Sequence, residues 1–204
     1  MLRDFSKPYQ RPPFTPDVPR NYDDVKLMKD AAKWQQATDA EIAQIERRGT
    51  YEILEQQSLR HDTPVLPSTI VYAKKRDGRY KARLVAGGHK QVTRLLYDFG
   101  SPTVSVTVLF LVLAVAVMME WSIAAADITG AFLYPDVPES PPIYMWLPKG
   151  HPLHGKGKVA KLKKSLYGLK EAARLFYDLF SATLKGFGFK QSTYDNCCFL
   201  VMAA

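Results

Sequence analysis

Asp127 is a single carboxylate at the end of a long apolar stretch, and Gly130 and Phe132 follow it closely. A lone acid at the end of an apolar strand is energetically costly unless it is hydrogen-bonded, hydrated or bound to a cation. Two interpretations are therefore open. The carboxylate caps a turn after the strand, or it is a ligand of a catalytic metal ion.

Basic residues are concentrated on both sides of Asp127 in the sequence. The chain has 204 residues, with 28 lysines and arginines against 20 acids and a net charge of +8. Eight basic residues and one acid lie between Lys74 and Arg94, and seven lysines and no acid lie between Lys149 and Lys170. This distribution indicates a polyanionic partner, with two solvated faces as the alternative.

The first basic block has the pattern of a β-hairpin. Its strands are predicted over residues 69–75 and 79–85, joined by the tight-turn pair Asp77-Gly78. Because side chains alternate along a strand, Arg79, Lys81 and Arg83 are expected on one side. Three neighbouring cations repel one another unless an anion lies among them. A phosphate-gripping hairpin and a solvated edge strand protected by charge are both open.

The remaining pattern is that of an α+β fold. Val104–Met119 is predicted as a buried helix, because this apolar run is shorter than the ~20 residues that a membrane-spanning helix needs. Trp121–Ile128 is predicted as the inner strand that delivers Asp127. Further helices are predicted over residues 25–48 and from 165 to 184, and further strands over residues 50–54, 143–146, 159–162 and 194–202.

Other features of the sequence indicate an intracellular protein with no membrane segment. Residues 1–24 are rich in proline, contain no apolar signal core and are interpreted as a linker or tail. The two cysteines, Cys197 and Cys198, are adjacent. This spacing favours neither a disulfide between them nor a zinc site.

Seven short motifs, taken together and in order, give the chain a family resemblance. They are Lys33-Trp34, Thr50–Leu54, Arg79–Gln91, Tyr97–Pro102, Asp127-Ile-Thr-Gly-Ala-Phe-Leu133, Ile143–Met145 and Lys164-Ser-Leu-Tyr-Gly-Leu-Lys170. With these motifs, which extend over roughly residues 28–202, the chain resembles the reverse transcriptase of copia-type retrotransposons. The resemblance favours the metal-ligand interpretation of Asp127.

The resemblance implies a right-hand polymerase, in which basic fingers pack on a palm whose antiparallel sheet is packed on helices. Residues 25–102 then form the fingers, with the N-terminal helix and the basic hairpin. Residues 103–136 form the palm segment with the first catalytic carboxylate. Residues 137–164 form an irregular basic insertion, and residues 165–204 supply a palm helix and strand.

The resemblance also implies a chemistry for Asp127. Enzymes of this kind add deoxynucleotides to a primer on an RNA or DNA template, and two Mg²⁺ ions stabilise the attacking and leaving oxygens. By resemblance, Asp127 is the first carboxylate ligand of Mg²⁺, and the carbonyl oxygen of Ile128 is a further ligand. Hard oxygen ligands of this kind suit Mg²⁺.

The same resemblance assigns residues around the incoming deoxynucleoside triphosphate. The backbone N–H groups of Gly130 and Ala131 face the triphosphate. Phe132 lies beneath the sugar, where a ring excludes a 2′-hydroxyl and so favours deoxynucleotides. An ordinary core phenylalanine is the alternative for Phe132.

Further binding residues come from the two basic blocks. In the hairpin, Lys74 or Lys75 acts with Lys81 or Arg83 on the triphosphate, and the sequence leaves the choice within each pair open. The nascent base pair and template are contacted by Tyr167, Gly168 and Lys170. Duplex phosphates, which position the substrate without reading its sequence, are contacted by Lys156, Lys158, Lys161, Lys163 and Lys164.

The chain departs from the family pattern at three places. Glu171-Ala-Ala-Arg174 stands where relatives usually have Gln-Ala-Pro-Arg, and Gly87 stands where they have a lysine. A second metal-binding Val-Asp-Asp strand is expected after Cys197–Met202, and neither this strand nor a thumb or RNase H portion follows in the 204 residues.

We therefore expect the chain alone to be inactive as a polymerase and to work with the remainder of a polyprotein. Its expected location is a cytoplasmic virus-like particle or the nucleus. A non-catalytic, basic nucleic-acid-binding remnant is the alternative function.

Overall fold

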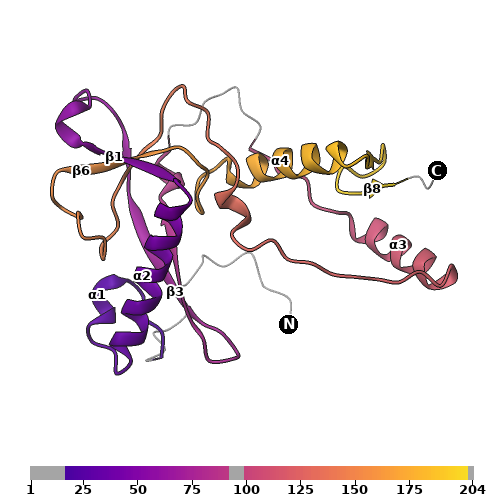
Figure 1. Ribbon diagram of the computed structural model, residues 1–204, viewed down its shortest axis with the longest axis horizontal. Helices are drawn as coiled ribbons and strands as arrows, with labels where there is room; N and C mark the ends of the chain where they lie inside the picture. The colour runs from indigo at the N-terminus through magenta and orange to yellow at the C-terminus, as the bar shows by residue number, and fades with distance from the viewer. Residues whose placement is uncertain (1–16, 92–98, 202–204) are drawn as a thin grey trace, which may run out of the picture.

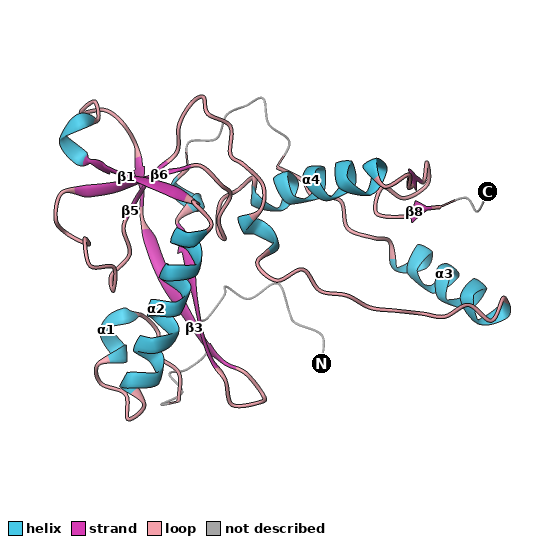
Figure 2. Ribbon diagram, in the orientation of Figure 1, coloured by secondary structure: helices cyan, strands magenta, loops and turns pink. Residues whose placement is uncertain are grey.

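The computed structural model describes residues 17–91 and 99–201, which form a mixed α+β structure. The largest sheet consists of β1 Tyr51–Glu55, β2 Val65–Leu66, β5 Tyr144–Trp146 and β6 Lys158–Leu162. Its spatial order is β1-β6-β5-β2, with β6 antiparallel to both neighbours and β2 parallel to β5 (Figure 2). The predicted α+β class is confirmed. The stretch 137–164 supplies two of the four strands, β5 and β6, at the places where strands were predicted over residues 143–146 and 159–162.

The basic hairpin lies under a helix. These elements are β3 Ser68–Lys74, β4 Tyr80–Ala86 and α2 Ala31–Arg47 (Figure 1). The two strands pair antiparallel, with Val71 opposite Arg83. Ile70 and Leu84, on the face covered by α2, are buried, whereas Val71 and Arg83 on the other face are exposed. The predicted hairpin is confirmed, and α2 determines which of its faces is open.

Trp34 is the centre of the contact between α2 and the hairpin. Its side chain is fully buried, and the ring centroids of Tyr72 and Tyr80 lie 5.6 and 4.6 Å from it, both edge-on. The hydroxyls of Tyr72 and Thr38 are 3.0 Å apart, and the Tyr80 hydroxyl donates to the Asp30 carboxylate at 2.5 Å. The latter hydrogen bond lowers the pKa of Asp30. These contacts fix the direction of the hairpin's outer face.

The helix predicted over residues 25–48 is divided in two. Residues Tyr22–Val25 form the short helix α1, which the Asn21 side chain caps, and α2 starts only after Asp30. Asp30 makes no side-chain cap to α2 because its carboxylate accepts the Tyr80 hydroxyl instead. The contact with Tyr80 therefore occupies the carboxylate that would otherwise cap the N-terminus of α2.

Helix α3 (Val106–Met118) forms as predicted, but the prediction that it is buried is wrong. Within α3 only Ala116 is buried, and Phe110 and Val117 expose 64% and 73% of their surface. In the described part of the chain no other helix or strand packs closely along α3, which projects away from the four-stranded sheet and the basic hairpin (Figure 1). Hydrophobicity indicates a segment that gains by burial, but burial needs a partner surface.

The inner strand predicted over Trp121–Ile128 is not formed, so this prediction is also wrong. These residues are exposed and belong to no strand. The backbone of residues 122–128 makes no hydrogen bond to any residue within 17–91 or 99–201. A strand needs a neighbour to pair its N–H and C=O groups. The segment runs instead as a long connection from α3 back toward the sheets (Figure 1).

The helix predicted from Ser165 begins later, as α4 (Ala172–Gly186). The preceding turn contains Gly168 at φ +89°, a left-handed conformation that interrupts a helix. The carbonyl of Tyr167 accepts the N–H of Ala86 at 2.7 Å, so the turn is bound to the end of β4. A Cβ added at Gly168 would lie 2.2 Å from the Ala86 carbonyl oxygen, which leaves room only for glycine.

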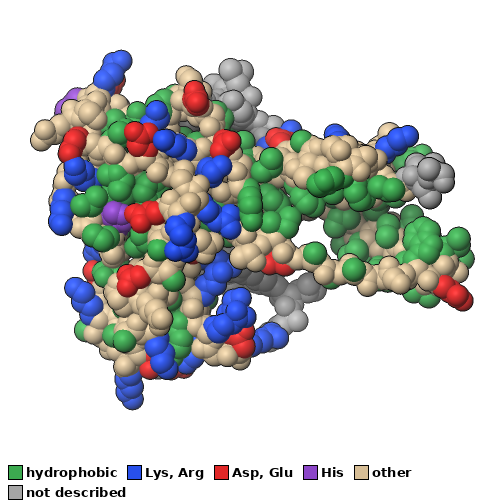
Figure 3. Space-filling model, viewed as in Figure 1, with side chains coloured by type: hydrophobic (Ala, Val, Ile, Leu, Met, Phe, Trp, Pro, Cys, Tyr) green, Lys and Arg blue, Asp and Glu red, His purple; other side chains and the backbone are tan. Residues whose placement is uncertain are grey.

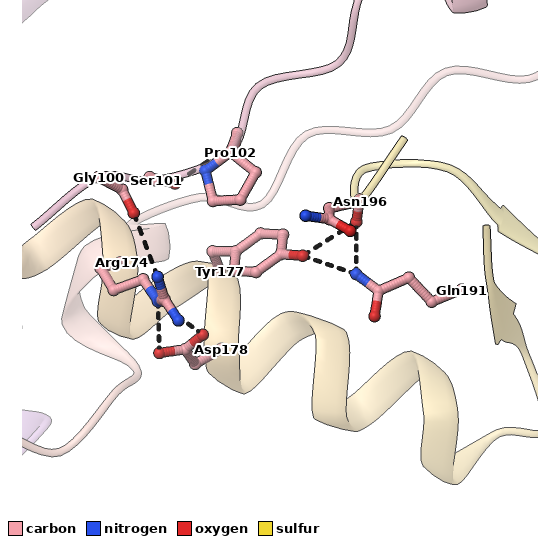
Figure 4. Close-up of polar contacts among 8 residues, drawn as sticks. All are labelled: Gly100, Ser101, Pro102, Arg174, Tyr177, Asp178, Gln191 and Asn196. Carbon is pink, nitrogen blue, oxygen red and sulfur yellow. Dashed lines mark hydrogen bonds and ion pairs between the residues drawn. The ribbon is translucent and has the colours of Figure 1, made fainter. Parts of the chain in front are cut away.

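Helix α4 is bonded to two chain segments that lie along it, around Gly100 and Asn196 (Figure 4). Arg174 donates to Asp178 at 3.0 Å and reaches the carbonyl of Gly100 at 3.5 Å. One turn further on, the Tyr177 hydroxyl donates to the carbonyl of Asn196 at 3.0 Å. The segment that leads into α3 and the C-terminal hairpin are therefore tied to the same helix.

The C-terminal strand predicted over residues 194–202 is shorter than expected. Its described part forms β8 (Phe199–Leu200), which pairs antiparallel with β7 (Lys190–Gln191). Some predictions fall partly outside the described residues. They concern residues 1–16 of the proline-rich segment, Arg94 and Tyr97 of the basic block and motif, and Met202.

Candidate functional site

The exposed connection that carries Asp127 rejoins the packed part of the molecule through a turn at Gly130. Gly130 has φ +70°, in the left-handed region that favours glycine, and precedes the short 3-10 turn η3 (Ala131–Leu133). Leu133 is buried in the core, and its N–H donates to the Gly130 carbonyl at 2.8 Å. The turn thus anchors the connection directly after Asp127 and holds Phe132 against the core.

Three side chains from distant segments meet beside this turn. The rings of Phe132 and Tyr167 pack edge to face at 5.4 Å, and the guanidinium of Arg83 lies 5.7 Å from the centroid of the Tyr167 ring. Phe132 also packs edge-on against Phe176 of α4 at 6.2 Å. The structure therefore brings together one cation and two rings that the sequence assigned separately to the nucleotide.

The pKa of the Tyr167 hydroxyl is influenced by its burial and by four charged side chains. Burial is the largest cause of the raised pKa of Tyr167. The positive charges of Arg83 and Arg48 act to lower this pKa. The negative charges of Glu41 and Asp127 act to raise it. Asp127 is the weakest of these influences on the Tyr167 pKa.

Asp127 itself is exposed to solvent. Among the residues of the described ranges, none makes a hydrogen bond or ion pair with its carboxylate. Ile128, whose carbonyl is the expected further metal ligand, is 40% exposed. The carboxylate is therefore open to a cation from solution, and the alternative of a turn cap finds no N–H donor in this part of the chain.

The donor set is too small for a two-ion metal centre. Across the described ranges 17–91 and 99–201, no group of three or more His, Cys, Asp or Glu residues is arranged to hold a metal ion. Two Mg²⁺ ions in one site need several oxygen ligands from the protein. The described residues present Asp127 as a single carboxylate ligand.

The hairpin's cations divide between its two faces. Lys81 and Arg83 occupy the outer face, which leads to Tyr167. Lys74 lies on the opposite face, where its ammonium group is 5.3 Å from the Tyr80 ring. Lys75 lies beyond the end of β3, at the turn. The structure thus separates Lys74 from Lys75 but keeps Lys81 and Arg83 on one face, where Arg83 is the one placed beside the Tyr167 ring.

Arg79, expected on the same face as Lys81 and Arg83, belongs to the turn instead. It precedes β4, and its guanidinium pairs with Asp77 at 2.6 Å. This hydrogen-bonded pair lowers the pKa of Asp77 and raises that of Arg79. The turn thus supplies a counter-charge to the first of the three expected cations, which leaves Lys81 and Arg83 as the cations of the outer face.

Most lysines of the second basic block are paired with acids. Lys158 pairs with Glu55, Lys163 with Glu52 at 3.0 Å, and Lys164 with Asp136 at 2.8 Å. Lys156 and Lys161 make no ion pair with another described residue. Exposed ion pairs contribute only about 0–1 kcal/mol to stability. None of the five lysines contacts the rings of Phe132 or Tyr167 in the described structure.

Lys170 and Glu171 both interact with Gln91. The Lys170 ammonium donates to the Gln91 carbonyl at 2.9 Å, and the Gln91 amide donates to both Glu171 oxygens at 2.7 and 2.8 Å. The acid that departs from the family pattern is thus matched by an amide of this chain. Gly168 allows the turn to approach the end of β4 closely. Lys170 stabilises the same turn, which carries Tyr167, through its hydrogen bond to Gln91.

The sequence did not reveal two charged residues of α2 that belong to this site. Glu41 is 8% exposed and accepts the N–H of Leu84 at 3.1 Å, and its burial raises its pKa. The Arg48 guanidinium lies 4.6 Å from the centroid of the Tyr134 ring. In the sequence, the only indication of these two residues was their helical spacing from the buried positions of α2. That spacing does not identify Leu84 and Tyr134 as their partners.

A cleft of about 840 Å³ opens elsewhere on the molecule. It lies between the loop around residues 58–66, the proline-rich segment 138–144 and the start of α4. Its walls include none of Arg83, Phe132 and Tyr167. The candidate site is therefore an open surface that is separate from this cleft.

The sequence is similar to a family described as "Reverse transcriptase (RNA-dependent DNA polymerase)", which matches residues 49–202. It is 34% identical over 170 residues to the "Retrovirus-related Pol polyprotein from transposon TNT 1-94" of Nicotiana tabacum, covering 80% of this chain and 12% of that protein. It is 35% identical over 170 residues to the "Transposon Ty1-LR2 Gag-Pol polyprotein" of Saccharomyces cerevisiae, covering 81% and 9%. It is 38% identical over 125 residues to the "Retrovirus-related Pol polyprotein from transposon RE1" of Arabidopsis thaliana, covering 60% and 8%.

The chain therefore spans 12% or less of the length of these three relatives. No solved structure matches it. In the described part of the chain, no helix has the length and apolar character needed to cross a membrane.

Proposed function

This chain belongs to the reverse transcriptase (RNA-dependent DNA polymerase) family, and we propose that it forms the fingers and part of the palm of such an enzyme in a copia-type retrotransposon polyprotein. The observation that supports the proposal is the meeting of Arg83 and Tyr167 with Phe132, on the turn that follows Asp127. A cation, a ring surface and an open carboxylate together suit a deoxynucleoside triphosphate.

Arg83 is the proposed triphosphate ligand. In the family's reaction, a primer 3′-hydroxyl attacks the α-phosphorus of the incoming nucleotide, and the bond to pyrophosphate breaks. A guanidinium binds phosphate oxygens through charge-assisted hydrogen bonds. The exposed Arg83 side chain has its guanidinium 5.7 Å from the centroid of the Tyr167 ring, and Lys81 adds a second positive charge on the same face.

The turn after Asp127 is the proposed support for the sugar and phosphates. The backbone N–H groups of Gly130 and Ala131 donate to no carbonyl within the described ranges, so they are available to a ligand. Phe132 is half-buried and is held between Tyr167 and Phe176. A ring fixed in this way offers a rigid surface against a ribose 2′-hydroxyl.

Asp127 is proposed as one ligand of a divalent cation, the kind of ion that such polymerases use. The two-ion centre implied by the family resemblance does not fit the described residues, which supply one carboxylate. We therefore assign no reaction step to a metal ion. The template with its primer, the remainder of the polyprotein, and a cytoplasmic particle or nuclear location are part of the same proposal.

The test measures binding of a fluorescent deoxythymidine triphosphate by the purified 204-residue chain. Arg83→Ala should weaken binding about tenfold, because one charge-assisted hydrogen bond to phosphate is lost. Arg79→Ala is the matched control. It removes a hairpin cation that is already paired with Asp77, and it should change the affinity less than about twofold.

Primer extension on an RNA template is the second measurement. Since the described residues supply one carboxylate, the isolated chain should bind the nucleotide without extending a primer. Equal losses for Arg83→Ala and Arg79→Ala would contradict the assignment of Arg83. Extension by the isolated chain would show that the catalytic ligands are complete without further segments.

A non-catalytic nucleic-acid-binding protein is the second candidate function. The net charge of +8 and the single carboxylate at the site favour it. This candidate predicts oligonucleotide binding that weakens steeply with salt, because phosphate contacts release counterions, together with no nucleotide binding that depends on Arg83. A flat response to salt would count against both candidates.

A further inference from the structure

Arg48 lies at the end of α2, on the edge of the candidate site. Its guanidinium is 4.6 Å from the centroid of the Tyr134 ring, one residue beyond the η3 turn. A guanidinium stacked on a ring keeps its N–H groups free at the edge. In the part of the chain that the structure describes, the Arg48 side chain donates to no carbonyl or carboxylate. It is therefore a positioned cation that has open donors.

Gln44 lies one helical turn before Arg48 and faces the same place. A Cβ added at Gly130 would lie 3.6 Å from Arg48 Nη2 and 3.6 Å from Gln44 Nε2. Both donors therefore lie against the turn that follows Asp127. Within residues 17–91 and 99–201, the side-chain amide of Gln44 also donates no hydrogen bond.

Arg48 and Arg83 come from different elements but influence the same group, the Tyr167 hydroxyl. Both positive charges act on the Tyr167 hydroxyl, Arg83 from β4 and Arg48 from the end of α2. Asp127 is the exposed acid there, while Glu41 is buried and accepts a backbone N–H. Arg48, Arg83 and Lys81 carry three positive charges here against the two acids Asp127 and Glu41, and the Gln44 amide adds a neutral donor. Such an excess suits an anion.

We propose that Gln44 and Arg48 form a second phosphate-binding pair of this site, beside the Gly130 turn. The proposal rests on the proposed nucleotide-binding function. The ligand chemistry is the phosphoryl oxygen, which either a nucleoside triphosphate or a polynucleotide backbone presents. The ring of Tyr134 holds Arg48 in place, and Gln44 adds a neutral donor.

The experiment compares Arg48→Ala with Arg47→Ala in the purified full chain. Both arginines lie at the C-terminal end of α2, where a positive charge interacts favourably with the helix dipole. They differ in that Arg47 is exposed and contacts no ring in the described structure. Arg48→Ala should weaken phosphate binding about tenfold, and Arg47→Ala less than about twofold. Arg48→Lys keeps the charge and loses the planar fork, so its affinity should fall between the two.

Two probes distinguish the sources of phosphate. One is fluorescent deoxythymidine triphosphate, and the other is a short fluorescein-labelled oligodeoxynucleotide at the same ionic strength. A loss for the triphosphate alone assigns the pair to the incoming nucleotide. A loss for the oligonucleotide alone assigns it to the polynucleotide backbone. Equal behaviour of Arg48→Ala and Arg47→Ala with both probes overturns the proposal.

Tyr134→Leu is a second variant that retains the guanidinium and removes its support. It should lower affinity for the same probe as Arg48→Ala, and far-ultraviolet circular dichroism verifies that each variant is folded. If Arg83→Ala weakens triphosphate binding and neither Arg48→Ala nor Tyr134→Leu affects either probe, the proposed function stands and this inference fails. If the unmodified chain binds neither probe, both fail.

Discussion

The hairpin under α2 and the arm formed by α3 and residues 121–128 are both rich in apolar residues, but they differ in burial. In the first region, Trp34 and Leu84 are fully buried. In the second, Phe110 exposes 64% and Trp121 59% of their surface. Apolar side chains gather along α4 and α3, whereas lysines and arginines are spread over the rest of the visible face (Figure 3). Hydrophobicity marks the segments that gain by burial, and burial itself depends on a second surface.

Asp127 lies where these two regions meet. Residues 122–126 make no backbone hydrogen bonds to other described residues, while Leu133, six residues after Asp127, is buried in the core. Arg83 and Tyr167 are held by the hairpin and by the turn bound to β4. The cation and ring are therefore on a rigid support, and the carboxylate is held from one side only.

The largest effect expected from this contrast is on stability. Trp34→Ala should lower the free energy of unfolding by about 3–5 kcal/mol, because it leaves a cavity between α2 and the hairpin. Trp121→Ala is the matched control and should change it by less than about 0.5 kcal/mol, since that ring is mostly exposed. Urea unfolding followed by circular dichroism measures both. Similar losses for the two variants would contradict the contrast.

A smaller effect, dependent on pH, is expected from Glu41. Its burial raises its pKa above 4.5, although the Leu84 N–H and the charges of Lys81 and Arg83 act against this. The folded chain then binds the proton more tightly than the unfolded chain. The resulting stabilisation is fully present below about pH 4.5 and is lost as the pH rises through the raised pKa.

Glu41→Gln is neutral at every pH and should not show that loss. Relative to the unmodified chain, the variant should gain in unfolding free energy as the pH rises above 4.5. Glu139→Gln, at an exposed acid, should follow the unmodified chain throughout. Parallel curves for Glu41→Gln and the unmodified chain would mean that Glu41 is not buried in solution.

The sequence predicted elements whose determinants are local. The hairpin was predicted from strand alternation and the Asp77-Gly78 pair, and the structure has both strands within about one residue of the predicted bounds. The placement of Lys81 and Arg83 on one face followed from the same alternation. The pairing of Arg79 with Asp77, two residues away, was also within reach of a local argument.

The features that the sequence did not predict depend on contacts between distant segments. The contact of Arg48 with Tyr134 joins the end of α2 to a turn far along the chain, and no local pattern indicates it. The pairing of Lys163 with Glu52 depends on β1 lying beside β6. The same reason explains the wrong strand over residues 121–128, since alternation and hydrophobicity do not supply a partner strand.

The smallest effect on stability is expected on α3, where Phe110→Lys and Val117→Lys replace two of its exposed apolar side chains. Each variant should change the free energy of unfolding by less than about 0.5 kcal/mol, because neither side chain is packed in the described structure. Binding of a hydrophobic fluorescent dye should fall in both, since apolar surface is removed. Ile70→Lys, which places a charge in the buried face of the hairpin, should instead prevent folding. If either α3 variant lost more than about 2 kcal/mol of unfolding free energy, this helix would be covered in solution. The hairpin region and the α3 arm would then both be buried, and they would differ only in the surface that covers them.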